Sequence, residues 1–246
     1  MKEKELPVPG TSGVNQSMQH LLSRPFTLVP ALLASVFLAF SAPASAQTPA
    51  VPSKWEKDIA AFEARDKTNA PPKNAILFIG SSSIRLWKTL AADFPEHQVI
   101  NRGFGGSQVS DSIEFAERIA FPYAPRLIVM YAGGNDINAK KSPEQVLADF
   151  KTFVGKVRVK LPKTRIAFIS IAGNPARWVQ IDRVRAANKL VADFCKTGEN
   201  LDYIDTHSQM LGSDGQPLPD IFVADRLHMN EKGYVIWKRV VAPHLK

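Results

Sequence analysis

The sequence has few of the residues that form disulfide bonds and metal sites. Its 246 residues include a single cysteine, Cys195, so no disulfide can form within the chain. Cys195 lies in an apolar stretch with a helical pattern, which predicts a small, buried, hydrophobic residue. The histidines at positions 20, 97, 207 and 244 show no metal-site spacing to one another or to Cys195. The sequence therefore argues against a zinc site.

A clustered charge of one sign is also absent. The chain has 31 lysine and arginine residues and 23 aspartate and glutamate residues, for a net charge of +8. The basic residues are dispersed, with no run of five or more. Because nucleic-acid-binding surfaces consist of clustered basic residues, we predict no nucleic-acid partner. The net charge favours a mild attraction to anionic surfaces or polymers.

The chain has no apolar run as long as the roughly 20 residues that a membrane-spanning helix needs. Its longest run, residues 26–40, holds 15 uncharged residues and includes Pro30. Arg24 precedes this run, and residues 44–46 (Ala-Ser-Ala) follow it with a small-x-small pattern. A basic flank, an apolar core and a small-residue exit predict a secretory signal peptide over residues 1–46. An uncleaved membrane anchor is the alternative.

Cleavage after Ala46 would leave 200 of the 246 residues, which suits one domain with a full core. The polar stretch before Met18 does not fit a signal peptide, so Met18 is an alternative start and residues 1–17 would then lie outside the protein. We expect residues 47–73 to form a tail and a helix, and residues 74–246 to form the main domain. The processed protein would be exported, either periplasmic or secreted, with no stable membrane span.

Short apolar runs alternate with helical patterns along most of the chain. The apolar runs predict strands at 75–79, 98–100, 126–132, 165–171 and 201–204. The helical patterns cover 54–66, 84–94, 109–119, 143–161, 179–196 and 231–245, with Ser142 as an expected N-cap. Strands that are apolar on both faces and alternate with helices predict an α/β fold, in which a mainly parallel sheet carries helices on both sides.

Three polar segments follow the first three predicted strands. They contain Ser82, Gly106 and Asn135, and each of these residues lies shortly after the carboxyl end of its strand. In open parallel sheets, ligands bind outside the carboxyl ends of the strands. The topology therefore predicts that the three residues meet at one edge of the sheet.

Ser82 stands in the segment Gly80-Ser81-Ser82-Ser83. The glycine permits a tight strand-to-helix turn, which would expose a hydroxyl at the N-terminus of a helix and make Ser82 a candidate nucleophile. An N-capping serine is the alternative. The segment does not match the G-x-S-x-G nucleophile elbow, because position 84 is isoleucine.

Two further groups suit the chemistry of acyl transfer. A backbone N–H of Gly105-Gly106 and the side chain of Asn135 are candidate donors to an oxyanion, although glycine and asparagine are also ordinary turn residues. Asp225 and His228 are three residues apart, so the carboxylate can hold one imidazole nitrogen while the other faces a serine. A helix-capping aspartate beside an unrelated histidine is the alternative.

In this order, the segments resemble those of the SGNH hydrolase superfamily, the GDSL-like lipases and esterases. The resemblance runs from about residue 74 to the C-terminus, so that residues 74–246 would be the hydrolase domain. It implies a three-layer α/β/α sandwich with a flavodoxin-like sheet of five parallel strands, and acyl transfer without a metal or cofactor. The residues to which it assigns roles are the nucleophile Ser82, its triad partners Asp225 and His228, and the oxyanion donors Ser82, Gly106 and Asn135.

Ser81 stands where the family has an aspartate before the nucleophile, so one charge beside Ser82 is missing. Residues 78–87 look most like the platelet-activating-factor acetylhydrolase subunits and related sugar acetylesterases, which implies a small ester or an acylated glycan as substrate. The alternatives are a lysophospholipase or thioesterase, an O-acyltransferase for cell-envelope polysaccharide, and a non-catalytic glycan-binding module. Arg177 and Trp178, after the fourth strand, are candidate substrate contacts, although a solvated arginine and a packing tryptophan fit as well. The oligomeric state stays open.

Overall fold

The computed structural model describes residues 53–246 of the chain. The predicted signal peptide at 1–46, its alternative start at Met18 and most of the predicted tail lie outside the described residues. Within residues 53–246, no helix combines the length and the apolar character needed to cross a membrane.

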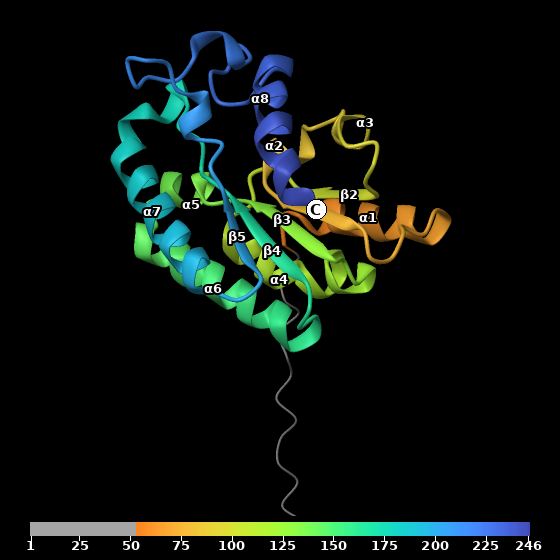
Figure 1. Cartoon of the computed structure of the whole chain (residues 1–246). Helices are drawn as coiled ribbons and strands as arrows, with labels where there is room; N and C mark the ends of the chain where they lie inside the picture. The colour runs from red at the N-terminus through yellow and green to blue at the C-terminus, as the bar shows by residue number, and fades with distance from the viewer. Residues whose placement is uncertain (1–52) are drawn as a thin grey trace, which may run out of the picture. The chain divides into compact units, whose positions relative to one another are not determined.

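Five parallel strands form one sheet in the order β2-β1-β3-β4-β5 (Figure 1). The strands are β1 (Ile76–Gly80), β2 (Val99–Gly103), β3 (Leu127–Tyr131), β4 (Arg165–Ile169) and β5 (Leu201–Ile204). Every residue of β1 and β3 is buried, which explains why these strands are continuous apolar runs. The chain reverses its direction across the sheet between β1 and β3, the place where ligands bind in open sheets of this kind.

Helices cover both faces of the sheet. One face carries α1 (Glu56–Thr68), α4 (Val109–Ile119), α6 (Pro143–Lys160) and α7 (Ile181–Thr197). The other face carries α2 (Ser82–Arg85), α3 (Leu90–Asp93) and α8 (Glu231–Val241). Each layer has its own buried apolar cluster against the sheet. The predicted three-layer α/β/α sandwich is therefore confirmed.

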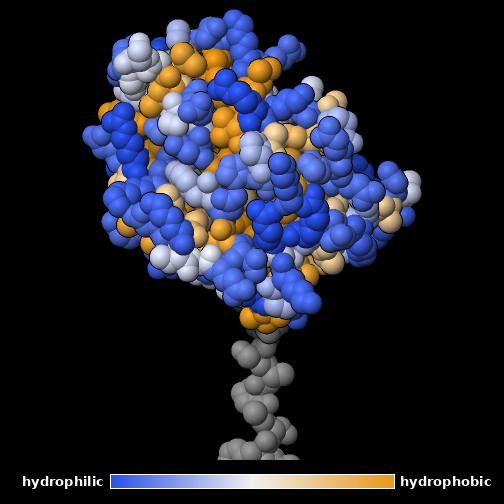
Figure 2. Space-filling model, in the orientation of Figure 1, coloured by the Kyte–Doolittle hydropathy of each residue, from blue (hydrophilic) through white to orange (hydrophobic). Residues whose placement is uncertain are grey.

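Short helices connect these elements. They are α5 (Gly134–Asn138), η1 (Phe121–Tyr123), η2 (Pro175–Gln180), η3 (Ser208–Met210), η4 (Pro219–Ile221) and η5 (Ala242–Leu245). Polar side chains cover most of the face shown in Figure 2. The large apolar residues that are exposed in the described part of the chain are Val159, Val179, Val223 and Val235, and scattered exposed residues of this kind are normal.

Local sequence explains where the long helices begin and end. Ser142 is the N-cap of α6, because its Oγ accepts the backbone N–H of Gln145 at 3.1 Å, as predicted. Asn230 caps α8 in the same way, by accepting the N–H of Lys232 at 2.9 Å. The predicted helix at 231–245 is too long, because a separate 3₁₀ turn starts at Ala242, with Pro243 in its first positions.

The predicted helix at 84–94 is wrong, because the chain forms two one-turn helices there, α2 and α3. Trp87 lies between them and is 1% exposed. Its indole N–H donates to Asp93 Oδ2 at 2.7 Å, and its ring packs edge-on against Trp237 with centroids 5.7 Å apart. Burial of this large side chain stabilises the break in the helix.

Other boundaries also differ from the prediction by a few residues. The strand predicted at 98–100 extends to Gly103, because the Arg102 guanidinium is satisfied by the Tyr123 hydroxyl at 2.8 Å and by Asp66. The helix predicted from residue 179 begins at Ile181, after η2.

Candidate active site

The turn after β1 places one serine of the triplet at a cavity. Gly80 has φ +125°, and a Cβ there would lie 2.0 Å from the backbone oxygen of Tyr131, so only glycine fits. Ser81 is 5% exposed, and its N–H donates to that same oxygen at 2.9 Å. The Ser83 carbonyl accepts the hydroxyl of Tyr234 at 2.8 Å. Ser82 begins α2 and lines a cavity at the sheet edge.

A histidine and an aspartate from the other end of the chain meet Ser82. Nε2 of His228 lies 2.9 Å from Ser82 Oγ, and Nδ1 lies 2.6 Å from Asp225 Oδ2. An ionised carboxylate can only accept, so it holds the proton on Nδ1 and leaves Nε2 to accept from the serine hydroxyl. Hydrogen bonds from His228, its backbone N–H first, together with the N–H of Leu227, lower the pKa of Asp225 to about 2. The carboxylate is therefore ionised at neutral pH.

The segment that carries His228 is held by backbone hydrogen bonds. The N–H of Val223 donates to the His228 carbonyl at 2.9 Å, and the N–H of Arg226 donates back to the Val223 carbonyl at 2.9 Å. Arg226 has φ +57°, a left-handed conformation that makes the chain turn sharply between Asp225 and His228. The Arg226 carbonyl accepts the N–H of Ala176, which ties the turn to η2.

Three hydrogen-bond donors face the same cavity. The N–H of Ser82 is at the first position of α2, where a helix supplies no acceptor. The N–H of Gly106 donates to no group of residues 53–246. The side-chain amide of Asn135 uses one of its hydrogens to donate to the Ser107 carbonyl at 3.0 Å, which leaves its second hydrogen free. The three groups suit a tetrahedral oxyanion.

A buried carboxylate fixes the helix that carries Asn135. Asp136 is fully buried, and its two carboxylate oxygens accept the N–H of Val109, the first residue of α4, at 3.3 Å. Lys141 Nζ lies 3.1 Å from Oδ1 of the same carboxylate. Burial raises the pKa of Asp136, against the opposing effect of Lys141. This network joins α5 to α4 beneath the cavity.

The cavity beside Ser82 has a volume of about 400 Å³ and a mostly polar lining. Its lining residues are Asp58, Ser82, Arg85, Gly105, Gly106, Asn135, Arg177, Leu227 and His228. Within residues 53–246, no group of three or more histidine, cysteine, aspartate or glutamate side chains is arranged to hold a metal ion.

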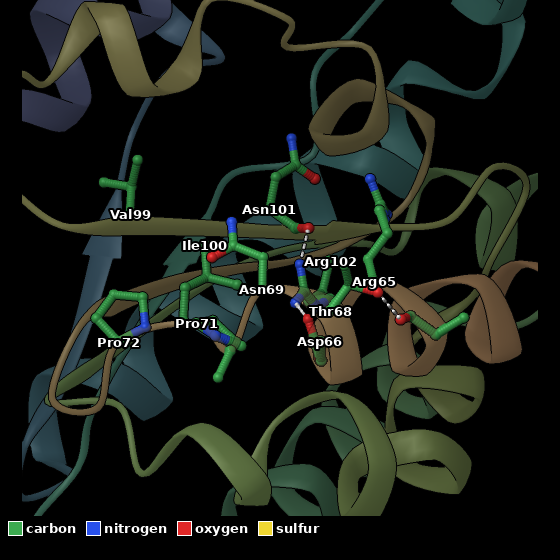
Figure 3. A pocket seen from close by; sticks show the side chains of 12 residues that line it. Arg65, Asp66, Thr68, Asn69, Pro71, Pro72, Val99, Ile100, Asn101 and Arg102 are labelled. Atoms are coloured by element: carbon green, nitrogen blue, oxygen red, sulfur yellow. Dashed lines mark hydrogen bonds and ion pairs between the residues drawn. The ribbon is translucent and has the colours of Figure 1, made fainter.

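A larger hollow of about 820 Å³ lies elsewhere, between the C-terminal end of α1 and β2 (Figure 3). Arg65, Asp66, Pro71 and Asn101 are among the residues around it. It contains no serine, histidine or cysteine, so the smaller cavity is the one with the means for nucleophilic chemistry.

The model of the GDSL-like lipase/acylhydrolase family matches residues 76–236, from β1 into α8. The chain belongs to this family. The match confirms the predicted family and makes the protein a carboxylic ester hydrolase. Ser82, Asn135 and His228 lie inside the matched region, whereas α1 lies before it. No curated protein matches the acylhydrolase.

Solved structures resemble the acylhydrolase in fold. A Streptococcus pneumonia protein whose description refers to a platelet activating factor is 20% identical, with a TM-score of 0.70 over 78% of this chain and 92% of its own. A GDSL-like lipase from Bacteroides thetaiotaomicron is 15% identical, with a TM-score of 0.65 over 76% and 97%. An acetylxylan esterase from Geobacillus stearothermophilus is 18% identical, with a TM-score of 0.53 over 71% and 95%.

The two candidate substrate contacts of the acylhydrolase separate in the structure. Arg177 lines the cavity, and one of its nitrogens donates to Asn135 Oδ1 at 3.1 Å and to the Gly134 carbonyl at 3.3 Å. Burial lowers the pKa of the Arg177 guanidinium. Trp178 lies instead in a neighbouring hollow of about 260 Å³ with Arg226, so it does not line the cavity that holds Ser82.

Sequence patterns did not indicate three residues at this site. Arg85 follows Ser82 by three positions, and this helical spacing is a signal that was available. Asp58 lines the cavity from α1, and the Trp55 indole N–H donates to the Gly105 carbonyl at 2.8 Å. Neither has a local signal, because Trp55 contacts a loop that is 50 residues away in sequence and Asp58 lines a cavity formed mainly by later segments.

Proposed function

We propose that this acylhydrolase is an exported esterase that removes small acyl groups by acyl transfer through Ser82, His228 and Asp225. The observation that carries the proposal is the chain of hydrogen bonds from Ser82 Oγ through the imidazole to Asp225, at 2.9 and 2.6 Å, beside a polar cavity. A nucleophile, a base and an orienting carboxylate in this geometry support acyl transfer over binding alone.

In the first half of the reaction, Ser82 Oγ attacks the ester carbonyl carbon while His228 Nε2 takes the serine proton. Asp225 orients the ring and stabilises the imidazolium that forms. When the tetrahedral intermediate collapses, the bond to the alcohol oxygen breaks, and His228 protonates the departing alcohol. In the second half, His228 removes a proton from water, and the resulting attack releases the carboxylic acid and restores Ser82.

The negative charge of each tetrahedral intermediate develops on the former carbonyl oxygen. The N–H groups of Ser82 and Gly106 and the free amide hydrogen of Asn135 would stabilise this charge. Loss of one such donor typically costs about 3 kcal/mol in the transition state. Arg177 holds the Asn135 amide in the orientation that aims its nitrogen at the cavity, because it donates to the amide oxygen.

The lining of the cavity supports a small acyl group on a polar alcohol. Leu227 is its only aliphatic side chain, and a long acyl chain would need an apolar groove. Asp58, Arg85 and Arg177 bring charged groups that can bind the hydroxyls of a sugar. The similar fold of an acetylxylan esterase is consistent with an acylated glycan as substrate.

The test is a series of p-nitrophenyl esters, from acetate to octanoate, with the full-length chain. We expect the highest turnover at acetate to butyrate and its loss in Ser82→Ala. Ser81→Ala and Ser83→Ala are the matched controls and should keep most of the activity. Retained turnover in Ser82→Ala, with loss in either neighbour, would show that another serine is the nucleophile. Turnover that rises towards octanoate would contradict the small-acyl preference.

Acyl transfer to a glycan would use the same acyl-enzyme, with a sugar hydroxyl in place of water. Adding an oligosaccharide acceptor to the assay separates the two outcomes by mass spectrometry of the products. For a hydrolase, we expect free carboxylic acid and no acylated sugar.

Export rests on the signal-peptide pattern over residues 1–46. Expression in a Gram-negative host, followed by cell fractionation and N-terminal sequencing, tests it. We expect the exported protein to begin at Gln47. A product that stays in the cytoplasm with residues 1–46 intact would contradict export.

A further inference from the structure

The turn before α1 lies against the loop that carries Gly106. The indole N–H of Trp55 donates to the Gly105 carbonyl at 2.8 Å. The Trp55 ring packs edge-on against Phe104, with centroids 5.9 Å apart and planes 81° apart. Trp55 is 9% exposed, so this contact is part of the core rather than a surface encounter. Trp55 lies before the region that the family model matches, whereas the Gly105 loop that it contacts lies inside that region.

The contact acts on one particular peptide unit. The Gly105 carbonyl and the Gly106 N–H belong to the same trans peptide, in which the C=O and N–H bonds point in opposite directions. The indole holds the oxygen on the side of α1 and therefore directs the N–H to the opposite side. Gly106 lines the cavity, and its N–H has no acceptor within residues 53–246.

The side chains of its own residues do not hold the direction of this peptide unit, because both residues are glycines. A Cβ on Gly105 would lie 2.9 Å from the Arg85 side chain, whereas Gly106 has φ +78° with nothing within 4 Å of where a Cβ would be. Glycine adopts positive and negative φ almost equally, so the Gly106 side of the peptide can rotate without a steric penalty. A hydrogen bond to its carbonyl is therefore the means of keeping the N–H in one direction.

The helix that follows Trp55 is itself anchored to the domain. Arg118 of α4 donates to both carboxylate oxygens of Glu56 at 2.8 Å and to both of Glu63 at 2.7 Å. Ile59 and Phe62 are buried in the cluster between α1 and the sheet. These contacts hold the first turn of α1, and with it the indole, in a fixed place relative to α4.

We propose that Trp55 is a positioning residue that holds the Gly105-Gly106 peptide with its N–H directed into the active-site cavity. The proposal rests on the role of Gly106 as an oxyanion donor in the proposed function. It makes α1, which precedes the family match, a part that the esterase needs for full transition-state stabilisation. Asp58 lies on the same helix and lines the same cavity, so α1 shapes the site at two points.

The test compares the full-length wild type with Trp55→Phe, which keeps an aromatic ring against Phe104 and removes the N–H. We expect kcat for p-nitrophenyl acetate to fall at least about tenfold, with KM nearly unchanged. This decrease should be smaller than the roughly 10²–10³-fold decrease in kcat that follows complete removal of an oxyanion donor. The affinity for a trifluoromethyl ketone, which forms an oxyanion with the nucleophile, should fall by the same factor. The matched control is Trp87→Phe, which removes an indole donor to Asp93 and should leave both values within about twofold.

Two outcomes separate this proposal from the proposed function. If Ser82→Ala kept its turnover, the proposed function would fail. If Ser82→Ala were inactive while Trp55→Phe kept the wild-type kcat and ketone affinity, the positioning role alone would be overturned. Should Trp55→Phe fold poorly, replacement of Trp55 by 3-benzothienylalanine, which has sulfur in place of N–H, decides the question with the ring shape intact. Wild-type kinetics in that variant would likewise overturn the positioning role.

Discussion

The two sides of the proposed active site, the oxyanion side and the triad side, are held in different ways. On the oxyanion side, Asn135 rests on buried groups, and the residues Ser107 and Asp136 beneath it are both 0% exposed. On the triad side, the side chains of Asp225 and His228 are 47% and 27% exposed, in an irregular segment between η4 and α8. Asn135 is thus fixed by the packed core, and His228 is held mainly by hydrogen bonds within its own segment.

This difference follows from what each side has to do. Donors that stabilise a developing charge must be in place before the charge appears, because reorganisation during the reaction would cost free energy. The base needs only the correct tautomer and direction, which Asp225 supplies locally. Substitutions on the triad side should therefore affect activity with little effect on stability, whereas those beneath the oxyanion donors should affect both.

The largest expected effect is on the triad side. His228→Ala should lower kcat by roughly 10⁴–10⁶-fold, because both proton transfers lose their base. The free energy of unfolding should change by less than about 1 kcal/mol, since the side chain is partly exposed. Turnover of p-nitrophenyl acetate and urea unfolding measure the two quantities, with His97→Gln as the control. A destabilisation of several kcal/mol would break the comparison between the two sides.

The next effect is on the oxyanion side. Asn135→Ala should lower kcat by roughly 10²–10³-fold with little change in KM, because the donor acts mainly on the transition state. Steady-state kinetics with p-nitrophenyl acetate measure this. Asn138→Ala, an exposed position on the same helix, should behave as wild type. If KM rose while kcat held, Asn135 would bind substrate rather than the oxyanion.

A smaller effect is expected one residue further along. Asp136→Ala removes the buried acceptor of the Val109 N–H and a partner of Lys141, so the free energy of unfolding should fall by about 2–3 kcal/mol. Because α5 is released from α4, kcat should fall as well. Asp149→Ala is the control, since it removes the other carboxylate partner of Lys141 and leaves the bond from Asp136 to α4 in place. Destabilisation in Asp136→Ala with wild-type kcat would show that stability and donor placement are separate.

The local part of this architecture could be predicted from the sequence. Buried parallel strands are continuous apolar runs, and the strand ends bring Ser82, Gly106 and Asn135 to one edge by topology alone. The Asp225-x-x-His228 spacing is also local, and the structure brings both side chains to Ser82. Such patterns could not predict the buried core under Asn135. The helix α5 is one turn long, and its sequence, Gly-Asn-Asp-Ile-Asn, is typical of a turn.

The contacts that depend on distant packing could not be predicted. Trp55 belongs to a stretch that predicted only an amphipathic helix, and nothing in it signals a hydrogen bond to Gly105. The helix predicted at 84–94 included Trp87, yet the burial of Trp87 ends that helix. Trp178 and Arg177 are adjacent in sequence but line different hollows. In each case the neighbours of a tryptophan or arginine, rather than its own segment, decide where the side chain lies.

The smallest expected effect contrasts the two carboxylates. Hydrogen bonds lower the pKa of Asp225 to about 2, whereas burial raises the pKa of Asp136. An unfolded aspartate titrates near about 3.9. The stability that Asp225 contributes is therefore present above about pH 4 and is lost as the pH falls towards 2. The contribution of Asp136 depends on pH in the opposite direction. It is complete below about pH 4 and is lost as the pH rises through the raised pKa.

Urea unfolding of the wild type, Asp225→Asn and Asp136→Asn between pH 2.5 and 6 (roughly the range that brackets a free carboxyl) tests this contrast. As the pH falls, the difference in free energy of unfolding between the wild type and Asp225→Asn should shrink. Over the same range, the free energy of unfolding of the wild type should rise relative to that of Asp136→Asn, because the folded state then gains from protonation of the buried carboxyl. Two differences that moved in the same direction would mean that both carboxylates feel one environment, and the distinction between a core-held side and a locally held side would fail.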